Sequence, residues 1–398
     1  MKSFYYFLLI LVLALLSGCS TLGTQRDVSG PVPLNRSVSE IPESQLLDVW
    51  VEVFDPGELP ANAEDASGLS LDIREAEARY MPEQLRDTME KTGYWGAVRM
   101  VPRGTEGSEV LVSGKILASD GEQLELEITA QDATGRQWFN AVYEAEVPAV
   151  VYQSTVQRGE PFQSLYNAIA NDLAKFRSTL AGEDITTVRR VAELRFAAGL
   201  APDAFAGYLQ RSASGEYTIV HLPSQDDPMY RRVQAIRERD FLLIDTLNGH
   251  FDNFYREMEK PYNDWRKARS EESAALHEIE KDALKRKLLG IAAIAGAIAI
   301  EATGNGNSAT GSVLRDTMVL GGVYAIKTGF DKDSETEIHR DAIEELGQSF
   351  ASEAQPLVVD VEGETHELTG SAEVQYTRWR GLLKQIYTTE TGLPGAVN

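Results

Sequence analysis

Cysteine is almost absent from this sequence, whose 398 residues contain a single one, Cys19. One cysteine excludes an intramolecular disulfide and provides no thiol cluster for a structural metal. Histidine is also scarce, and its five copies lie far apart along the chain, so they form no metal-binding pattern. We therefore predict no metal and no cofactor. The histidines are His221, His250, His277, His339 and His366.

The common catalytic motifs are absent as well. There is no Gly-x-Ser-x-Gly nucleophile turn. His277-Glu278 begins like a zinc-protease helix, but Lys281 occupies the place of the second histidine. The glycine-rich stretch 304–311 lacks the lysine of a phosphate-binding loop. These absences predict a non-enzymatic protein.

Positive charge is in short supply, because 38 Lys and Arg face 61 Asp and Glu, for a net charge of −23. Phosphate backbones and anionic lipid surfaces repel a strongly acidic protein. The balance therefore argues against nucleic acid as a partner. It suits a folded body held near a membrane by other means, or a basic protein partner.

The N-terminus has the three parts of a secretion signal. Lys2 provides positive charge, and Phe4–Leu16 is an apolar run too short to span a bilayer comfortably. The following Leu16-Ser17-Gly18-Cys19 resembles the lipobox of bacterial lipoproteins. The resemblance implies a signal peptide over 1–18 and a diacylglyceryl and palmitate anchor on Cys19.

The residue after the lipidated cysteine bears on sorting. In lipoproteins an Asp at this position is the familiar signal for retention in the inner membrane, and here the residue is Ser20. The resemblance therefore implies an outer-membrane protein with its body on the periplasmic face. Residues 19–44 contain Pro31, Pro33 and Pro42 and little periodicity, which predicts a flexible linker that holds the body away from the lipid.

Residues 45–150 are predicted to form a small α/β sandwich of the order β-α-β-β-β-β. Alternating apolar residues indicate strands over 47–53, 95–101, 110–118, 124–130 and 138–147. A helix is expected over 71–91, with Pro82 opening its second part. Asp120-Gly121 is a strong hairpin signal. The predicted class of the whole chain is α+β.

The remainder is predicted to be mainly helical. Connecting helices are expected over 151–225, and a long amphipathic helix should begin after Asp227-Pro228 in the region 226–355. Pro261 is expected to break or kink that helix. Residues 356–398 should form a short hairpin followed by a final helix.

Two apolar stretches rich in small residues stand out within 226–355. Leu288–Ile300 and Met318–Ile326 contain glycines that let helices approach closely. Thirteen residues of helix span about 20 Å, too little for a hydrocarbon core of about 30 Å. We favour a helical hairpin packed within the protein over an oligomer contact or interfacial membrane insertion. The predicted packing residues are Gly290, Gly296, Gly321 and Gly322.

Three further segments resemble a family of uncharacterised proteobacterial lipoproteins: 79–98, beginning Arg-Tyr-Met-Pro-Glu-Gln-Leu, then Asp132–Arg136, and Asp240–Asp245. That resemblance covers most of the mature chain and implies no activity. The predicted topology of 45–150 is similar to the N-terminal domain of TolB and to lipoprotein activators of peptidoglycan synthases, a likeness of topology alone.

Together these features predict a lipid-anchored, non-enzymatic scaffold or docking component of a cell-envelope complex, with an envelope protein as partner. Two alternatives remain open. One is an enzyme that acts on an envelope polymer through unrecognised acidic residues. The other is a subunit of a homo-oligomeric assembly or pore built through the glycine-bearing helices.

Overall fold

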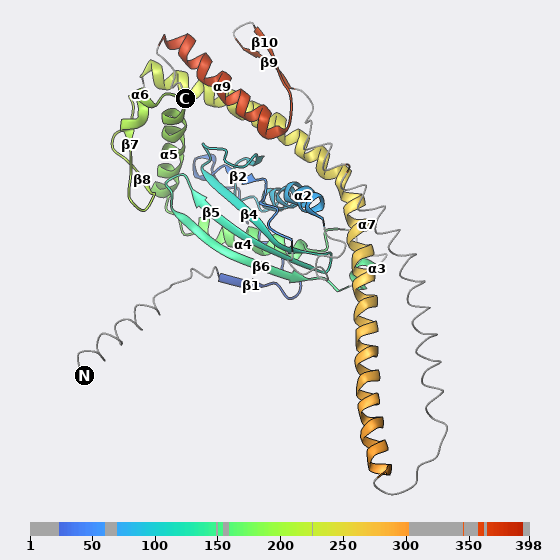
Figure 1. Cartoon of the computed structure of the whole chain (residues 1–398). Helices are drawn as coiled ribbons and strands as arrows, with labels where there is room; N and C mark the ends of the chain where they lie inside the picture. Colours follow the sequence, from blue (N-terminus) through green and yellow to red (C-terminus); the bar gives the residue numbers. More distant parts are fainter. Residues whose placement is uncertain are drawn as a thin grey trace, which may run out of the picture.

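The fold is known from a computed structural model. It describes residues 24–59, 70–148, 150–153, 159–224, 226–301, 345, 357–361 and 364–392, with only the backbone of 272–301. Its core is a mixed six-stranded sheet of order β1-β6-β5-β4-β2-β3, accompanied by helices, which confirms the α+β class (Figure 1). The strands are β1 (Thr24–Asp27), β2 (Val49–Glu52), β3 (Val98–Val101), β4 (Val110–Ser119), β5 (Gln123–Asp132) and β6 (Gln137–Glu146).

The sheet combines a parallel part with an antiparallel meander. Strand β2 lies between β3 and β4 and is parallel to both. Helix α2 (Leu71–Glu90) makes the crossover between β2 and β3, as parallel neighbours require. Strands β4, β5 and β6 are antiparallel, and the predicted hairpin joins β4 to β5, with Gly121 at a φ of +97°.

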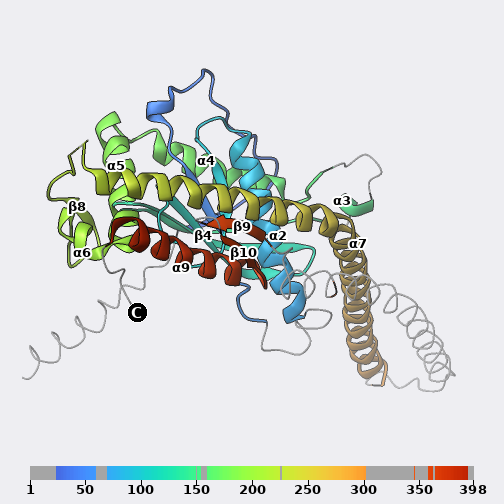
Figure 2. The same cartoon turned by 90° about the horizontal axis from the view of Figure 1, so that it is seen from above.

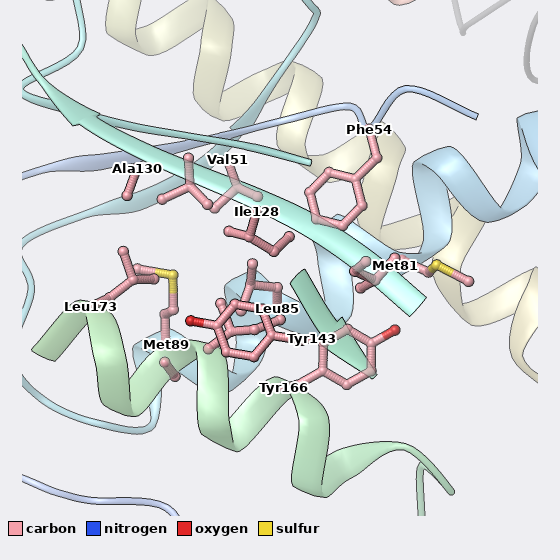
Figure 3. Packing of buried hydrophobic residues seen from close by; sticks show 14 of the residues in the cluster. Val51, Phe54, Met81, Leu85, Met89, Ile128, Ala130, Tyr143, Tyr166 and Leu173 are labelled. Carbon is pink, nitrogen blue, oxygen red and sulfur yellow. The ribbon is translucent and has the colours of Figure 1, made fainter. Parts of the chain in front are cut away.

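One face of the sheet is buried under helices α2 and α4 (Gln163–Arg177). Alternate strand residues such as Val51 and Ile128 point into this layer and meet Leu85 of α2 and Leu173 of α4 (Figure 3). Tyr143 of β6 also lies here, and its hydroxyl donates a hydrogen bond of 2.7 Å to an Asp172 carboxylate oxygen. The alternation predicted from sequence therefore identifies the core face correctly.

From residue 24 on, the structure corrects the prediction of a flexible linker over 19–44. Strand β1 pairs with β6 in parallel, with Thr24 opposite Ala141 and Asp27 opposite Glu144. Val28 is buried in the main core, and Val32 packs against it. Five strands were expected and six are present. The sequence TQRD is exposed at all four positions and has no alternation, so local pattern gave no sign of a strand.

Pro82 does not divide α2, contrary to expectation, because the helix is continuous from residue 71 to 90. A proline lacks the N–H that would bond the carbonyl four residues earlier, here that of Ala78. That carbonyl instead accepts a hydrogen bond of 2.9 Å from the backbone N–H of Phe54. The proline therefore frees a backbone acceptor that fastens the chain after β2 to the helix.

The long helix predicted after residue 227 is α7 (Pro228–Glu301), 74 residues that continue through Pro261 without a break. Its early part packs with α5 (Gly182–Leu200) and α9 (Ala372–Thr391) in a second apolar cluster that includes Trp50 and Met100 of the sheet. Figure 2 shows α9 alongside this part of α7 and a change of direction of α7 near α3 (Val150–Gln153).

The boundary predicted at residue 150 does not separate two hydrophobic cores. The main cluster contains residues of the sheet, of α4 and α5, and of α7, including Phe254 and Trp265.

The smaller elements are η1 (Glu43–Gln45), α6 (Pro202–Phe205), η2 (Ala206–Tyr208), and the hairpins β7 (Leu209–Arg211) with β8 (Tyr217–Ile219) and β9 (Leu357–Val361) with β10 (Glu364–Leu368). The predicted C-terminal hairpin and helix are both present.

Candidate functional site

Most residues singled out from sequence lie outside the described residues. Gly290 and Gly296 fall in the last turns of α7, where the backbone is helical as predicted. The packing of Leu288–Ile300 against Met318–Ile326 cannot be placed, because the second segment is outside the described ranges. Cys19, Ser20, Gly321 and Gly322 also lie outside the described residues.

What the structure brings together is a buried polar cluster that fixes α7 to the body, which we call the α7 clamp: Glu77, Glu160, Tyr262 and Arg266. The Arg266 guanidinium makes two contacts with the Glu160 carboxylate, of 2.6 and 2.9 Å. It also lies over the Tyr262 ring, 4.3 Å from its centroid. Both side chains of the ion pair are less than 5% exposed, so the pair is shielded from water.

Glu77 forms the second half of the α7 clamp. One of its carboxylate oxygens accepts hydrogen bonds from the Ser119 hydroxyl at 2.6 Å and from the Tyr262 hydroxyl at 2.7 Å. Arg74 lies 3.5 Å from the other oxygen. Burial raises the pKa of Glu77, while Arg74 and the two hydroxyls oppose that shift. The cluster thus joins α2, the end of β4 and α7 through one carboxylate.

A second polar network joins α2, α4 and α7. The Gln84 side-chain amide donates to the Gln163 carbonyl oxygen at 2.7 Å, and Gln163 donates in turn to Thr88 and Asn167. Tyr255 of α7 donates to Gln84. Three of these contacts join helices distant in sequence, and the Gln163–Asn167 bond lies within α4, so the network fixes how α2, α4 and α7 are oriented.

A different polar contact joins α7 to α9, and we call it the α9 latch. Asp240 of α7 is fully buried and accepts a 3.1 Å hydrogen bond from the Trp379 indole N–H. The Tyr376 hydroxyl and the Arg380 guanidinium each approach its other oxygen at 3.4 Å. Burial raises the pKa of Asp240 to about 6, although Arg380 and the two aromatic donors favour the charged form.

Helix α7 also covers the β3 edge of the sheet. The Asn248 side chain donates to the Met100 carbonyl at 2.9 Å and accepts from the Met100 N–H at 2.7 Å, as a neighbouring strand would. Beside it, Arg99 of β3 contacts Asp48 at 3.0 Å and Asp245 at 2.6 Å. This edge is therefore closed to pairing with another chain.

Two open cavities meet at the loop that follows β3, and Arg103 lines both. The first, of about 290 Å³, contains the carboxylates of Glu52, Asp55 and Glu127. The second, of about 260 Å³, lies between this loop and α9 and includes Arg380. Burial raises the pKa of Glu52, whose carboxylate accepts a 2.9 Å hydrogen bond from the Gly104 N–H.

Several carboxylates whose pKa is raised lie in different surroundings. Glu52 lines a cavity, whereas Glu77 and Asp240 face protein donors in the α7 clamp and the α9 latch. Burial also raises the pKa of Glu83 to about 8, beside Arg86 at 2.5 Å, and that of Glu109 to about 7. Neither lines either of the two cavities. Glu109 accepts a 2.8 Å hydrogen bond from the Asp48 N–H, whereas the Glu83–Arg86 pair lies within α2.

Comparisons with known proteins give no relative for this chain. No protein-family model, no curated protein and no solved structure matches it. Among the described residues, no group of three His, Cys, Asp or Glu side chains could hold a metal ion. Within the same part of the chain, no helix is long and apolar enough to cross a membrane.

Sequence reasoning missed the α7 clamp and the α9 latch. Arg266 and Glu160 are separated by 106 residues, and Asp240 and Trp379 by 139. The one available signal was charge on an apolar helical face, since Arg266 adjoins Trp265 and Asp240 adjoins Phe241. A charged residue there needs a partner when buried, but the sequence does not identify which one.

Proposed function

We propose that this protein is a lipid-anchored, periplasm-facing docking component of a cell-envelope complex. The lipobox ending at Cys19 supports the anchor, and Ser20 supports placement in the outer membrane. The single observation that carries the docking role is the length of α7, which continues beyond the sheet and the helices that pack against it. At 1.5 Å per residue, its 74 residues measure about 110 Å along the helix axis, which changes direction near α3 (Figure 2).

The two halves of α7 differ in a way that suits a rigid arm. The half that ends near Ser270 is held by the α7 clamp, the α9 latch and the contacts to β3. The part from residue 272 to 301, about 45 Å of helix, continues away from the sheet in Figure 1. A firmly based helix that extends from a folded body is suited to holding a partner at a fixed distance.

A second candidate function rests on the first cavity. Glu52, Asp55 and Glu127 are carboxylates in an open depression that also contains Arg103 and Lys115. General acid–base chemistry on a polymer needs a carboxylate with a raised pKa, and Glu52 meets that condition. An enzyme of this kind should release fragments from purified envelope polymer, and Glu52→Gln should abolish the release while leaving the fold intact.

Photocrosslinking in cells tests the docking role. A photoreactive residue at position 278 probes the arm, and one at position 214, in the exposed turn between β7 and β8, is the matched control on the body. We expect position 278 to give a discrete adduct with another envelope protein and position 214 to give none. Cys19→Ala, which removes the acylation site, should abolish that adduct. An arm that yields only adducts within its own chain would overturn the proposal.

A further inference from the structure

Strand β1 fixes the chain to the body close to the proposed lipid anchor. Thr24 lies opposite Ala141 of β6, and the parallel pairing continues to Asp27 opposite Glu144. The Val28 N–H then donates to the Glu144 carbonyl at 2.8 Å. The first described residue of the chain is therefore already part of the sheet.

Contacts beyond the pairing hold this segment in place. Arg26 makes an ion pair of 2.9 Å with Asp172 of α4, and Val28 is only 7% exposed. Further along, Asn167 donates to the Val32 carbonyl at 2.7 Å, and Asn171 donates to the Pro33 carbonyl at 2.9 Å. The segment thus follows the surface of α4 instead of hanging free.

The covalent chain sets how far the body can lie from the lipid. Five residue steps separate Cys19 from Thr24, and they reach at most about 18 Å at 3.6 Å per step. The flexible linker expected from sequence would allow more. Twenty-five free residues average about 28 Å and extend to about 85 Å. Pairing of β1 therefore removes most of that freedom.

We propose that the edge of the body formed by β1 and the adjoining surface of α4 faces the lipid headgroups of the membrane. This inference rests on the proposed lipid anchor and adds an orientation to it. Strand β1 ends the sheet, and among the described strands none pairs with its outer side. Its backbone groups are thus free to hydrogen-bond to headgroups and water.

The distribution of charged side chains over β1, β5 and β6 is compatible with that orientation. Strand β1 carries one positive and one negative side chain, Arg26 and Asp27, so its formal charge is zero although the protein is strongly acidic. Glu125 of β5 lies opposite Glu144 of β6, and both share with Glu127 the face of the sheet away from α2 and α4. An anionic headgroup layer repels that face and leaves the β1 edge as the side that can approach it.

The opposite side of the body is then directed into the periplasm. Strand β3 ends the other side of the sheet, and five strand spacings of about 4.8 Å place it about 24 Å from β1. Helix α9 packs with α7 beyond that end, opposite β1 in Figure 1. A partner would therefore reach α9 and the early part of α7 without passing between the body and the membrane.

Quenching by lipids in vesicles tests the orientation with the full, acylated chain. Because lipid occupies the only native cysteine, Thr24→Cys and Gln385→Cys each give one free thiol for a fluorophore, in β1 and on the exposed side of α9. The vesicles contain phosphatidylethanolamine, phosphatidylglycerol and a lipid with a nitroxide on its headgroup. We expect quenching at position 24 to exceed that at position 385 several-fold. A 20-residue Gly/Ser insertion between residues 22 and 23 should remove the difference.

Mass measurement of the N-terminal peptide separates the two possible failures. Acylated protein with equal quenching at positions 24 and 385 overturns the orientation and leaves the anchor intact. Protein without acyl chains overturns the anchor, and the orientation with it. Acylated protein whose quenching difference survives the insertion also overturns the inference, since the short connection would then not be its cause.

Discussion

Helix α7 is fastened to the body in two places that bury polar groups differently. At the α7 clamp, Arg266 and Glu160 form a charge pair of which both members are shielded. At the α9 latch, Asp240 is buried, but its cationic partner Arg380 is 20% exposed, and two of its three donors are neutral. At the clamp, burial opposes and Glu160 favours the charged Arg266 guanidinium, whose pKa is raised, whereas at the latch burial raises the pKa of Asp240 to about 6.

The comparison teaches that several hydrogen bonds do not by themselves cancel the effect of burial on a carboxylate. Asp240 accepts bonds from Trp379 and Tyr376 as well as Arg380, yet burial dominates and its pKa rises. The clamp and the latch therefore should respond differently to mutation and to pH.

The largest expected effect is from Arg266→Met, which leaves Glu160 buried without its cation. Breaking a buried ion pair costs about 3–5 kcal/mol of the free energy of unfolding. Urea denaturation at pH 7 measures the loss. Adding Glu160→Gln removes the unpaired charge, so the double variant should be more stable than Arg266→Met alone. A single variant within about 1 kcal/mol of the wild type would show that the clamp does not fasten α7.

The next effect is a pH dependence at the α9 latch. The pKa of Asp240 rises from 3.8 to about 6 on folding, so the folded state binds this proton more tightly than the unfolded state. Its contribution to stability is therefore full below pH 4 and is lost as the pH rises to 6. A shift of about 2 units corresponds to about 3 kcal/mol.

Thermal unfolding of the wild type and of Asp240→Asn across pH 4–7 checks this sign. We expect the stability of the wild type relative to the variant to fall as pH rises from 4 to 6 and then to level off. A difference between the two proteins that grows with pH would contradict the raised pKa.

Asn248→Ala should have a smaller effect, localised to the sheet edge. It leaves the N–H and the carbonyl of Met100 without their α7 partner, at a cost of about 1–3 kcal/mol. Hydrogen exchange of the Met100 amide should accelerate as well. Asn248→Asp is the matched control, because it keeps the acceptor for that N–H and removes only the donor. Equal exchange in all three proteins would mean that Asn248 does not protect the edge.

The smallest effect is expected from an exposed ion pair on the same helix. Lys260 lies 2.5 Å from Asp264 one turn away, and its side chain is 87% exposed. Lys260→Ala should lower the free energy of unfolding by less than about 0.5 kcal/mol. Comparing this loss with that of Arg266→Met shows how much burial adds to the free energy that a charge pair on α7 contributes to stability. Similar losses for the two variants would remove the basis of the comparison.

The local sequence pattern was enough to predict the helices and strands whose own residues show a clear alternation or helical spacing of apolar side chains. The alternation in 110–130 and the Asp120-Gly121 turn gave β4 and β5, and the apolar spacing after Asp227-Pro228 gave α7. In each of these cases the burial of a residue follows from its immediate neighbours. That information is present in a stretch of ten to twenty residues.

The elements that sequence did not predict are stabilised by partners far along the chain. Strand β1 depends on β6, although Thr24 and Ala141 are 117 positions apart, and TQRD has no apolar face of its own. The polar clusters were harder still to predict, because Glu77 and Tyr262 are 185 positions apart in the sequence. Acidic residues are so abundant here that their positions in the sequence single out none of them.

The packing of α9 beside the early part of α7 gives the chain a modular character. Asp240 and Trp379 meet, so the 85 residues 272–356 form an insert in the sequence between two parts of the chain that contact each other. The entropy of closing such a loop grows slowly, by about 0.6 kcal/mol for each doubling of its length. Evolution can thus lengthen, shorten or exchange this insert and leave the sheet and its helices to fold as before.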